Sequence, residues 1–289
     1  MRVIKTIKQM QRLAASLRRG GKTIGFVPTM GALHEGHLSL IRAARKACDI
    51  VAVSIFVNPT QFGPAEDYTI YPRDSKRDAT LCRNAGVDIL FCPSVEEMYP
   101  ADFQTFVQVE KLSQGLCGPH RLGHFCGVAT VVLKLFQTVQ PHQAFFGQKD
   151  YQQSRIIQQM VQDLALSIRV RILPTVRETD GLAMSSRNIH LNREERQAAT
   201  VIYRTLKLGE ELIRQGERTS HVIRKKMLEL IRHASLIRLD YLAIVAPKNL
   251  QEIREITGPI LIAIAAWIGK TRLIDNLRLD SESKEGRRP

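Results

Sequence analysis

The sequence predicts an α/β fold, with a Rossmann-like, doubly wound parallel sheet followed by a smaller C-terminal α+β domain. Strand-like and helix-like segments alternate over the first two-thirds of the chain, as crossover connections between parallel strands require. Two strand-like segments, 50–56 and 168–173, are rich in β-branched residues, which is typical of strands buried on both faces. After Leu191 the pattern changes to two helices followed by three strands.

Hydrophobic periodicity predicts each element in turn. Apolar runs predict strands at 24–27, 50–56, 88–91, 105–109, 144–146 and 168–173. Apolar residues at helical spacing predict intervening helices at 37–48, 75–85, 128–139 and 151–164. The last third predicts helices at 193–214 and 220–232, then strands at 239–245, 260–268 and 272–277.

The change in pattern places a domain boundary near Val176. Residues 1–176 then form the Rossmann-like domain, and residues 177–289 form the smaller one. Residues 280–289 are charged and lack large apolar side chains, so we expect a disordered tail there.

Composition indicates a globular protein without a membrane segment. Of 289 residues, 44% are apolar and 24% charged, which permits a sizeable core. The N-terminus lacks an apolar signal region, and the longest apolar run, 260–268, is only strand-sized. Five cysteines without disulfide-framework spacing agree with a reducing compartment. We therefore predict a cytoplasmic protein that does not bind membranes.

The net charge of +14 raises the possibility of nucleic-acid binding. The basic residues are spread along the chain, no RNA-module signature accompanies them, and aromatic residues make up only 6%. A basic solvated surface is the simpler interpretation, and we predict no nucleic-acid partner. An RNA-binding module descended from a synthetase-like fold remains as an alternative.

A cluster of two cysteines and two histidines suggests zinc at first sight. The four residues are crowded around glycines within ten positions, and no second ligand pair lies on a separate element. We favour an irregular loop with buried or half-buried thiols, formed by Cys117, His120, His124 and Cys126.

Residues 28–37 combine the features of a phosphate site. They follow an apolar run and lead into a segment with helical spacing, so they form a turn between strand and helix. A helix N-terminus offers unpaired N–H groups and a partial positive charge, which suit a phosphate. His34 and His37 would add donors, and Gly36 lets the backbone approach a ligand closely. We predict a nucleotide-phosphate site here rather than a pair of surface histidines.

Three further polar segments follow predicted strands, at 58–62, 147–150 and 177–187. Ligands of doubly wound sheets bind outside the carboxyl ends of the strands, where all these segments converge. Lys149 could reach phosphates as a mobile charge. Residues 184–187, the cationic end of the last segment, could cover the phosphates.

Amide side chains in these segments suit a small polar substrate. Asn58, Gln61 and Gln153 can orient a hydroxyl or a carboxylate without supplying charge. The chain contains no Walker loop, no nucleophile elbow and no G-x-G-x-x-G fingerprint. Donors without a nucleophile favour a reaction in which the substrate itself attacks a phosphate.

Several motifs together resemble those of pantothenate synthetases. They occur in the family's order and spacing from the N-terminus to about Asn276, at residues 28–37, 56–62, 71–73, 123–128, 146–153, 176–188 and 272–276. The His-x-Gly-His element alone, a HIGH motif, indicates only the wider nucleotidyltransferase superfamily. Two positions depart from the family pattern: Leu122 stands where a proline is usual, and His142 where an aspartate is usual.

The resemblance implies an ATP-dependent ligase of pantothenate and coenzyme A biosynthesis. (R)-Pantoate would attack ATP to form pantoyl adenylate and release pyrophosphate, and β-alanine would then displace AMP. It implies Mg²⁺ with ATP as co-substrate, no tightly bound organic cofactor, and a homodimer. Another adenylyl transferase of the superfamily remains the alternative.

The resemblance also implies roles for individual residues. Catalysis would involve His34, His37 (as proton donor), Lys149 and Arg187. Pantoate would contact Met30, Gln61 and Gln153, and β-alanine would contact Gln61, while Asp78 is a weaker candidate near magnesium. ATP would contact Met30, Gly31, Ala32, Leu33, His34, Glu35, Gly36, His37, Gly147, Gln148, Lys149, Asp150, Val176, Met184, Ser185, Ser186 and Arg187. The C-terminal domain would close as a lid over the nucleotide.

Overall fold

A computed structural model describes residues 1–64, 66–234 and 236–280 of the chain. The chain divides into two compact units. The first contains residues 1–176 and 184–186, and the second contains residues 177–183 and the chain from Arg187 onward. Residues 281–289, most of the predicted disordered tail, lie outside the described residues.

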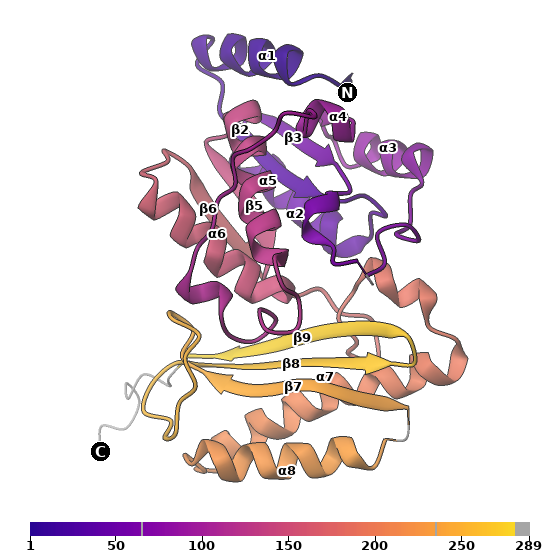
Figure 1. The fold of residues 1–289 in the computed structure, drawn as a ribbon, viewed down its shortest axis with the longest axis vertical. Coiled ribbons are helices and arrows are strands. Elements are labelled where there is room, and N and C mark those ends of the chain that lie inside the picture. Colours follow the sequence, from indigo (N-terminus) through magenta and orange to yellow (C-terminus); the bar gives the residue numbers. More distant parts are fainter. Residues whose placement is uncertain (65, 235, 281–289) are drawn as a thin grey trace. The chain divides into compact units, whose positions relative to one another are not determined.

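A parallel sheet forms the centre of the first unit (Figure 1). Its six described strands are, in spatial order, β1 (Arg2–Ile4), β4 (Ile89–Phe91), β3 (Ile50–Ile55), β2 (Ile24–Thr29), β5 (Gln143–Gly147) and β6 (Arg169–Leu173). The chain leaves β2 toward β3 and β4 on one side, and later adds β5 and β6 on the other. The carboxyl end of β2 is therefore the switch point of a doubly wound sheet, where ligands bind.

Helices cover both faces of this sheet. On one face, α2 (Glu35–Ala47) and α3 (Ser75–Asn84) share an apolar cluster with the strands. On the other, α1 (Ile7–Arg19) and α6 (Tyr151–Asp163) pack against α5 (His124–Val139). Phe136 of α5 makes edge-on ring contacts with Phe26 and Phe146 of the strands. Together with the second unit, this confirms the predicted fold class.

One predicted strand is wrong. Residues 105–109 do not join the sheet, and the sixth strand is β1, whose register pairs Val3 with Leu90. The segment is instead held on α5, where Thr130 Oγ1 accepts a bond from the backbone N–H of Val107 at 2.9 Å. Nearby, Lys134 lies 4.5 Å from the ring centre of Phe103. The segment thus lies along a helix rather than in the sheet, and periodicity alone does not distinguish these two arrangements.

Three helical elements at the edge of the first unit were also not predicted. They are α1, the helix α4 (Val95–Met98) and the 3₁₀ turn η2 (Lys111–Ser113). The start of α1 is tied to α4, because Glu97 Oε1 accepts a bond from the backbone N–H of Ile7 at 2.7 Å.

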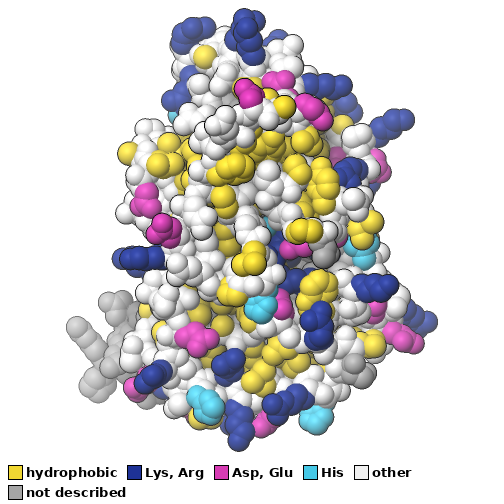
Figure 2. Space-filling model, in the orientation of Figure 1, with side chains coloured by type: hydrophobic (Ala, Val, Ile, Leu, Met, Phe, Trp, Pro, Cys, Tyr) yellow, Lys and Arg dark blue, Asp and Glu magenta, His cyan; other side chains and the backbone are white. Residues whose placement is uncertain are grey.

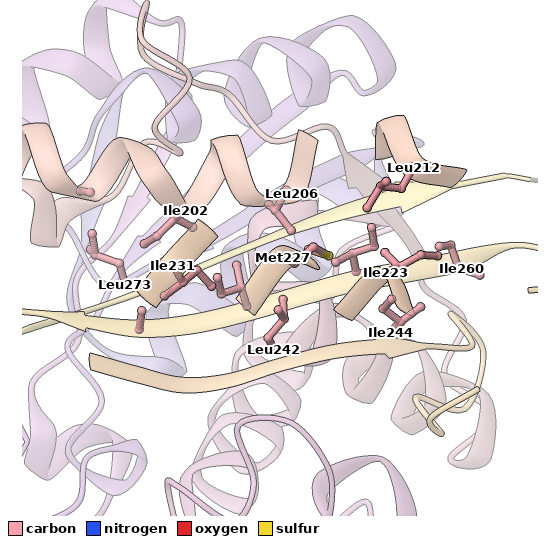
Figure 3. Close-up of a cluster of buried hydrophobic side chains, with 14 of the residues drawn as sticks. Ile202, Leu206, Leu212, Ile223, Met227, Ile231, Leu242, Ile244, Ile260 and Leu273 are labelled. Carbon is pink, nitrogen blue, oxygen red and sulfur yellow. The ribbon is translucent and has the colours of Figure 1, made fainter. Parts of the chain in front are cut away.

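Two helices and an antiparallel sheet make up most of the second unit. The helices α7 (Arg193–Arg214) and α8 (Ser220–Arg232) have the predicted bounds. They pack on the strands β7 (Ile237–Val245), β8 (Ile260–Ile268) and β9 (Thr271–Leu279), which pair in that order. The core lies between the helices and the sheet, where Leu206, Met227 and Ile244 are among the buried side chains (Figure 3).

Basic side chains do not gather in one place on the face shown in Figure 2. Lysines and arginines alternate there with acidic and neutral side chains among the described residues. In the same described part of the chain, every helix is too short or too polar to cross a membrane.

Candidate active site

The turn after β2 is closed by the two histidines. α2 begins at Glu35, with His34 as its N-cap. Nδ1 of His34 accepts a bond from the backbone N–H of Gly36 at 3.1 Å, and Nδ1 of His37 accepts one from the backbone N–H of His34 at 3.4 Å. The ring centroids lie 4.2 Å apart. Gly36 permits this arrangement, because a Cβ atom there would lie 2.8 Å from Cε1 of His34.

These contacts determine which nitrogen carries the proton in each neutral ring. A ring nitrogen that accepts a bond is unprotonated, so the proton of each neutral imidazole lies on Nε2. Burial lowers the pKa of His37 to about 3, with smaller effects from the charges of His34 and Lys149. At neutral pH His37 is therefore uncharged with Nε2–H as its donor, and Lys149 lies within electrostatic reach. Glu35, by contrast, is exposed and pairs with Arg42.

A buried carboxylate from α3 holds the residues before the histidines. Asp78, only 1% exposed, accepts hydrogen bonds from the backbone N–H groups of Ala32 and Leu33, each at 2.8 Å. Ala32 has a φ of 50°, which is unfavourable for a residue with a side chain. Arg77 donates to the carbonyl oxygen of Leu33 at 3.0 Å. The first turn of α3 thus stabilises a strained backbone, and the place of Asp78 near magnesium stays a prediction.

The turn after β3 presents Gln61, at the end of the 3₁₀ turn η1 (Pro59–Gln61). Asn58, which is buried, donates to Oε1 of Gln61 and to the carbonyl oxygen of Gly127, both at 3.1 Å. Nε2 of Gln61 lies 3.0 Å from the sulfur of Met30, so the structure brings two predicted pantoate contacts together. α5 approaches η1 so closely that a Cβ on Gly127 would lie 2.3 Å from the carbonyl oxygen of Thr60.

The loop after β5 carries the predicted lysine. Gly147 ends the strand, and the 3₁₀ turn η3 (Gln148–Asp150) leads directly into α6. Lys149 Nζ lies 3.5 Å from Asp150 Oδ1, and both side chains are half-buried.

Two neighbouring glutamines in the first turn of α6 have different surroundings. Gln153, the predicted pantoate contact, is half-buried. Gln152 is buried, accepts a bond from the N–H of Cys117 at 3.0 Å, and donates to the carbonyl oxygens of Leu112 and Gly115. Gln152 therefore anchors the loop that precedes α5, a role that the sequence did not indicate.

The predicted phosphate-covering loop is divided between the two units. Met184 in the first unit donates its backbone N–H to the carbonyl oxygen of Val176 at 3.0 Å. Oγ of Ser186 lies 3.1 Å from the hydroxyl of Tyr71, whose ring packs edge-on against Phe62. Arg187 belongs to the second unit, and its catalytic role stays a prediction.

The cysteines and histidines before and within α5 form no metal cluster in the described part of the chain. Both ring nitrogens of His124 are engaged: Nε2 lies 2.9 Å from Arg121, and Nδ1 lies 2.8 Å from the carbonyl oxygen of Gln61. The five cysteines carry free thiols. His124 thus supports the Gln61 turn, and because the two residues are 63 positions apart, no local pattern signals it.

The two departures from the family pattern are not among the residues that make these contacts. Leu122 is 86% exposed at the surface before α5. His142 precedes β5, and its Nδ1 accepts a bond from the backbone N–H of Ile24 at 3.0 Å. An imidazole nitrogen can serve there as the acceptor that a carboxylate would also provide.

Comparison with known proteins identifies the family. The family model described as pantoate-beta-alanine ligase matches residues 2–278. A pantothenate synthetase from Thermotoga neapolitana is 53% identical over 276 residues, covering 96% of this chain and 99% of the relative. One from Moorella thermoacetica is 53% identical over 280 residues, covering 97% and 99%.

Solved structures agree with the sequence comparisons. The crystal structure of pantothenate synthetase from Thermus thermophilus has a TM-score of 0.91 and 47% identity, covering 96% of this chain and 99% of that one. A pantoate-beta-alanine ligase from Francisella tularensis, complexed with beta-gamma ATP and beta-alanine, has a TM-score of 0.78 and 37% identity, covering 96% and 97%. The chain therefore belongs to the pantoate–β-alanine ligase family, enzymes that make pantothenate from pantoate and β-alanine.

Proposed function

We propose that this protein joins (R)-pantoate to β-alanine in two steps, through a pantoyl adenylate formed from ATP. The observation that carries this proposal is the histidine turn at the switch point of the sheet. His34 and His37 there have their Nδ1 atoms turned toward the backbone, and Lys149 lies within electrostatic reach of His37. Ring N–H donors beside a cation suit the phosphates of a nucleotide.

In the first step the carboxylate of pantoate attacks the α-phosphorus of ATP. A new O–P bond forms, the bond to the bridging oxygen breaks, and pyrophosphate leaves. The carboxylate is already ionised, so no general base is needed. Negative charge grows on the phosphorus oxygens and on pyrophosphate, where His34, His37 and Lys149 would stabilise it. Because the pKa of His37 is lowered to about 3, it acts as a hydrogen-bond donor rather than as a source of a free proton at neutral pH.

In the second step the amine of β-alanine attacks the carbonyl carbon of the adenylate. A C–N bond forms, the C–O bond to AMP breaks, and the amine releases one proton to solvent. Gln61 and Gln153 carry uncharged amides, which suit the hydroxyl and carboxyl groups of pantoate. Asn58 directs the amide of Gln61, and Met30 lies against it.

Magnesium would enter with ATP. The described residues contain no group of three or more carboxylate, histidine or cysteine side chains placed to hold a metal ion. Both oxygens of Asp78 accept bonds from backbone N–H groups. Mg²⁺ is commonly held by substrate phosphates with few protein ligands, and it would neutralise charge on the phosphates.

Four further expectations stay predictions of the sequence. They are the contacts of Gly147, Gln148, Asp150, Val176 and residues 184–186 with ATP, the closing of residues 177–289 as a lid carrying Arg187, the homodimer, and the cytoplasmic location.

Isotope exchange between pyrophosphate and ATP tests the proposal. We expect exchange that requires pantoate and no β-alanine, followed by AMP release that requires β-alanine. Lys149→Ala should slow exchange about 100-fold, because one donor to the developing charge is lost. Lys46→Ala, at an exposed lysine in the last turn of α2, should leave it unchanged.

Two outcomes would contradict the proposal. Exchange that proceeds without pantoate would remove pantoate as the attacking group. Exchange with pantoate, but with AMP retained in the final product after β-alanine is added, would identify an adenylyl transferase of the same superfamily.

A further inference from the structure

We propose that Arg121 and His124 are positioning residues that set the affinity for pantoate by holding the main chain at Gln61. This inference rests on the proposed function, in which Gln61 contacts pantoate. It extends that function to residues outside the predicted ligand contacts, on the loop before α5 and in its first turn.

The main-chain carbonyl of Gln61 is the centre of the arrangement. His124 and Arg121 both reach this oxygen, at 2.8 Å from Nδ1 and 3.3 Å from a guanidinium nitrogen. Arg121 also lies 2.9 Å from Nε2 of His124. Arginine can only donate, so Nε2 of His124 accepts and its proton lies on Nδ1. His124 therefore donates to the carbonyl oxygen of Gln61 in a single defined tautomer.

The neutral state of His124 is stable under ordinary conditions. Burial, followed by the charge of Arg121, lowers its pKa to about 4. A protonated ring would direct a second N–H at the guanidinium group, which cannot accept it.

An ion pair fixes the guanidinium itself. Arg121 donates to both carboxylate oxygens of Glu66, at 2.7 and 2.6 Å, which is the two-pronged geometry that arginine favours. Hydrogen bonds from Arg121 lower the pKa of Glu66 despite the opposing effect of its burial. Glu66 follows Gln61 on the same connection, so Arg121 holds that connection at two points.

The side chain of Gln61 is held separately from its main chain. Asn58 donates to its Oε1 atom, and the amide nitrogen rests against the sulfur of Met30. The amide can present a single orientation to a substrate only when the main chain of Gln61 is also fixed. A displacement of about 1 Å in such a positioning group can cost about 100-fold in rate. Loss of the carbonyl contacts should therefore weaken pantoate binding while leaving the histidine turn intact.

Three variants test this inference, with kinetics and hydrogen exchange measured on each. His124→Ala removes the donor, whereas His124→Asn keeps an N–H close to the place of Nδ1. Arg121→Met removes the ion pair. For His124→Ala and Arg121→Met we expect the KM for pantoate to rise about 10-fold while the KM for ATP stays within twofold. Backbone amides of residues 58–64 should exchange faster. His124→Asn should restore most of the pantoate affinity.

The matched control is Arg214→Met, which removes another arginine–glutamate pair, between the exposed Arg214 and the buried Glu210 of α7. It should change neither KM. Equal rises in both KM values, or failure of His124→Asn to restore pantoate affinity, would overturn the inference. If the wild-type enzyme shows no pantoate-dependent pyrophosphate exchange, the proposed function fails. The inference has a separate test: if the backbone amides of residues 58–64 exchange hydrogen at the same rate in the variants as in the wild type, Arg121 and His124 do not hold this turn.

Discussion

The histidine turn and the Gln61 turn follow neighbouring parallel strands, yet they are held in different ways. The histidine turn closes largely on itself, because His34 and His37 accept bonds from backbone N–H groups within the same turn. The Gln61 turn is held mainly by residues about 60 or more positions away in the sequence, on and before α5. One turn is a local motif, and the other is assembled by the tertiary fold.

This difference matches the ligands that the two turns would bind. A phosphate is recognised by charge and by N–H groups that a helix N-terminus already provides. A small hydroxy acid is recognised by the placement of uncharged amides, which lose their selectivity when they move. We expect substitutions in the histidine turn to reduce catalysis directly, and substitutions around the Gln61 turn to act on pantoate affinity.

Replacement of His37 should have the largest effect. His37→Ala removes a donor beside the phosphates, so pyrophosphate exchange should fall by about 100- to 1000-fold at saturating pantoate. His233→Ala, at an exposed histidine of the second unit, is the matched control and should retain full exchange. A decrease smaller than about 10-fold in His37→Ala would show that the histidine turn is not the centre of charge stabilisation.

Asp78→Asn tests how far the histidine turn depends on a distant residue, and its effect should be intermediate. The amide places an N–H₂ group against one of the two backbone N–H groups of Ala32 and Leu33, leaving a donor without an acceptor. The KM for ATP should rise about 10-fold, with little change for pantoate. Asp102→Asn, at an exposed loop residue, should change neither. If raising magnesium restored the affinity for ATP, Asp78 would be a metal ligand rather than a support for the turn.

The pH dependence of stability should give the smallest effect. The pKa of His37 falls from its ordinary value of 6.5 to about 3 in the folded protein, so the unfolded chain binds an additional proton between these values. The contribution of neutral His37 to the free energy of unfolding is thus complete above pH 6.5 and is lost as the pH falls toward 3. In urea unfolding without substrates, His37→Asn should reduce the slope of stability against pH by up to about 1.4 kcal/mol per pH unit. Identical slopes would mean that His37 binds protons equally in the folded and unfolded chain, so that its pKa is not lowered by folding.

Much of the fold could be predicted because the patterns involved are local. The helices α7 and α8 have the predicted bounds, since apolar residues recur at helical spacing through both, although α1, also 13 residues long, was not predicted. The prediction placed a strand at residues 105–109 and missed β1, because such short segments lack a clear local pattern. Each is a short apolar segment, and whether it pairs with β4 or lies on α5 depends on which surface is nearby.

The sequence by itself determined the fold class, the histidine turn and the polar ends of the strands, because helix caps and hydrophobic periods are written within a few residues. Only the tertiary structure decided what holds these parts in place. Asp78 lies 46 positions from Ala32, and His124 lies 63 from Gln61, and neither pair has a local signature. Such contacts form when α3 and α5 pack against the sheet, so they follow from the folded chain rather than from any one segment.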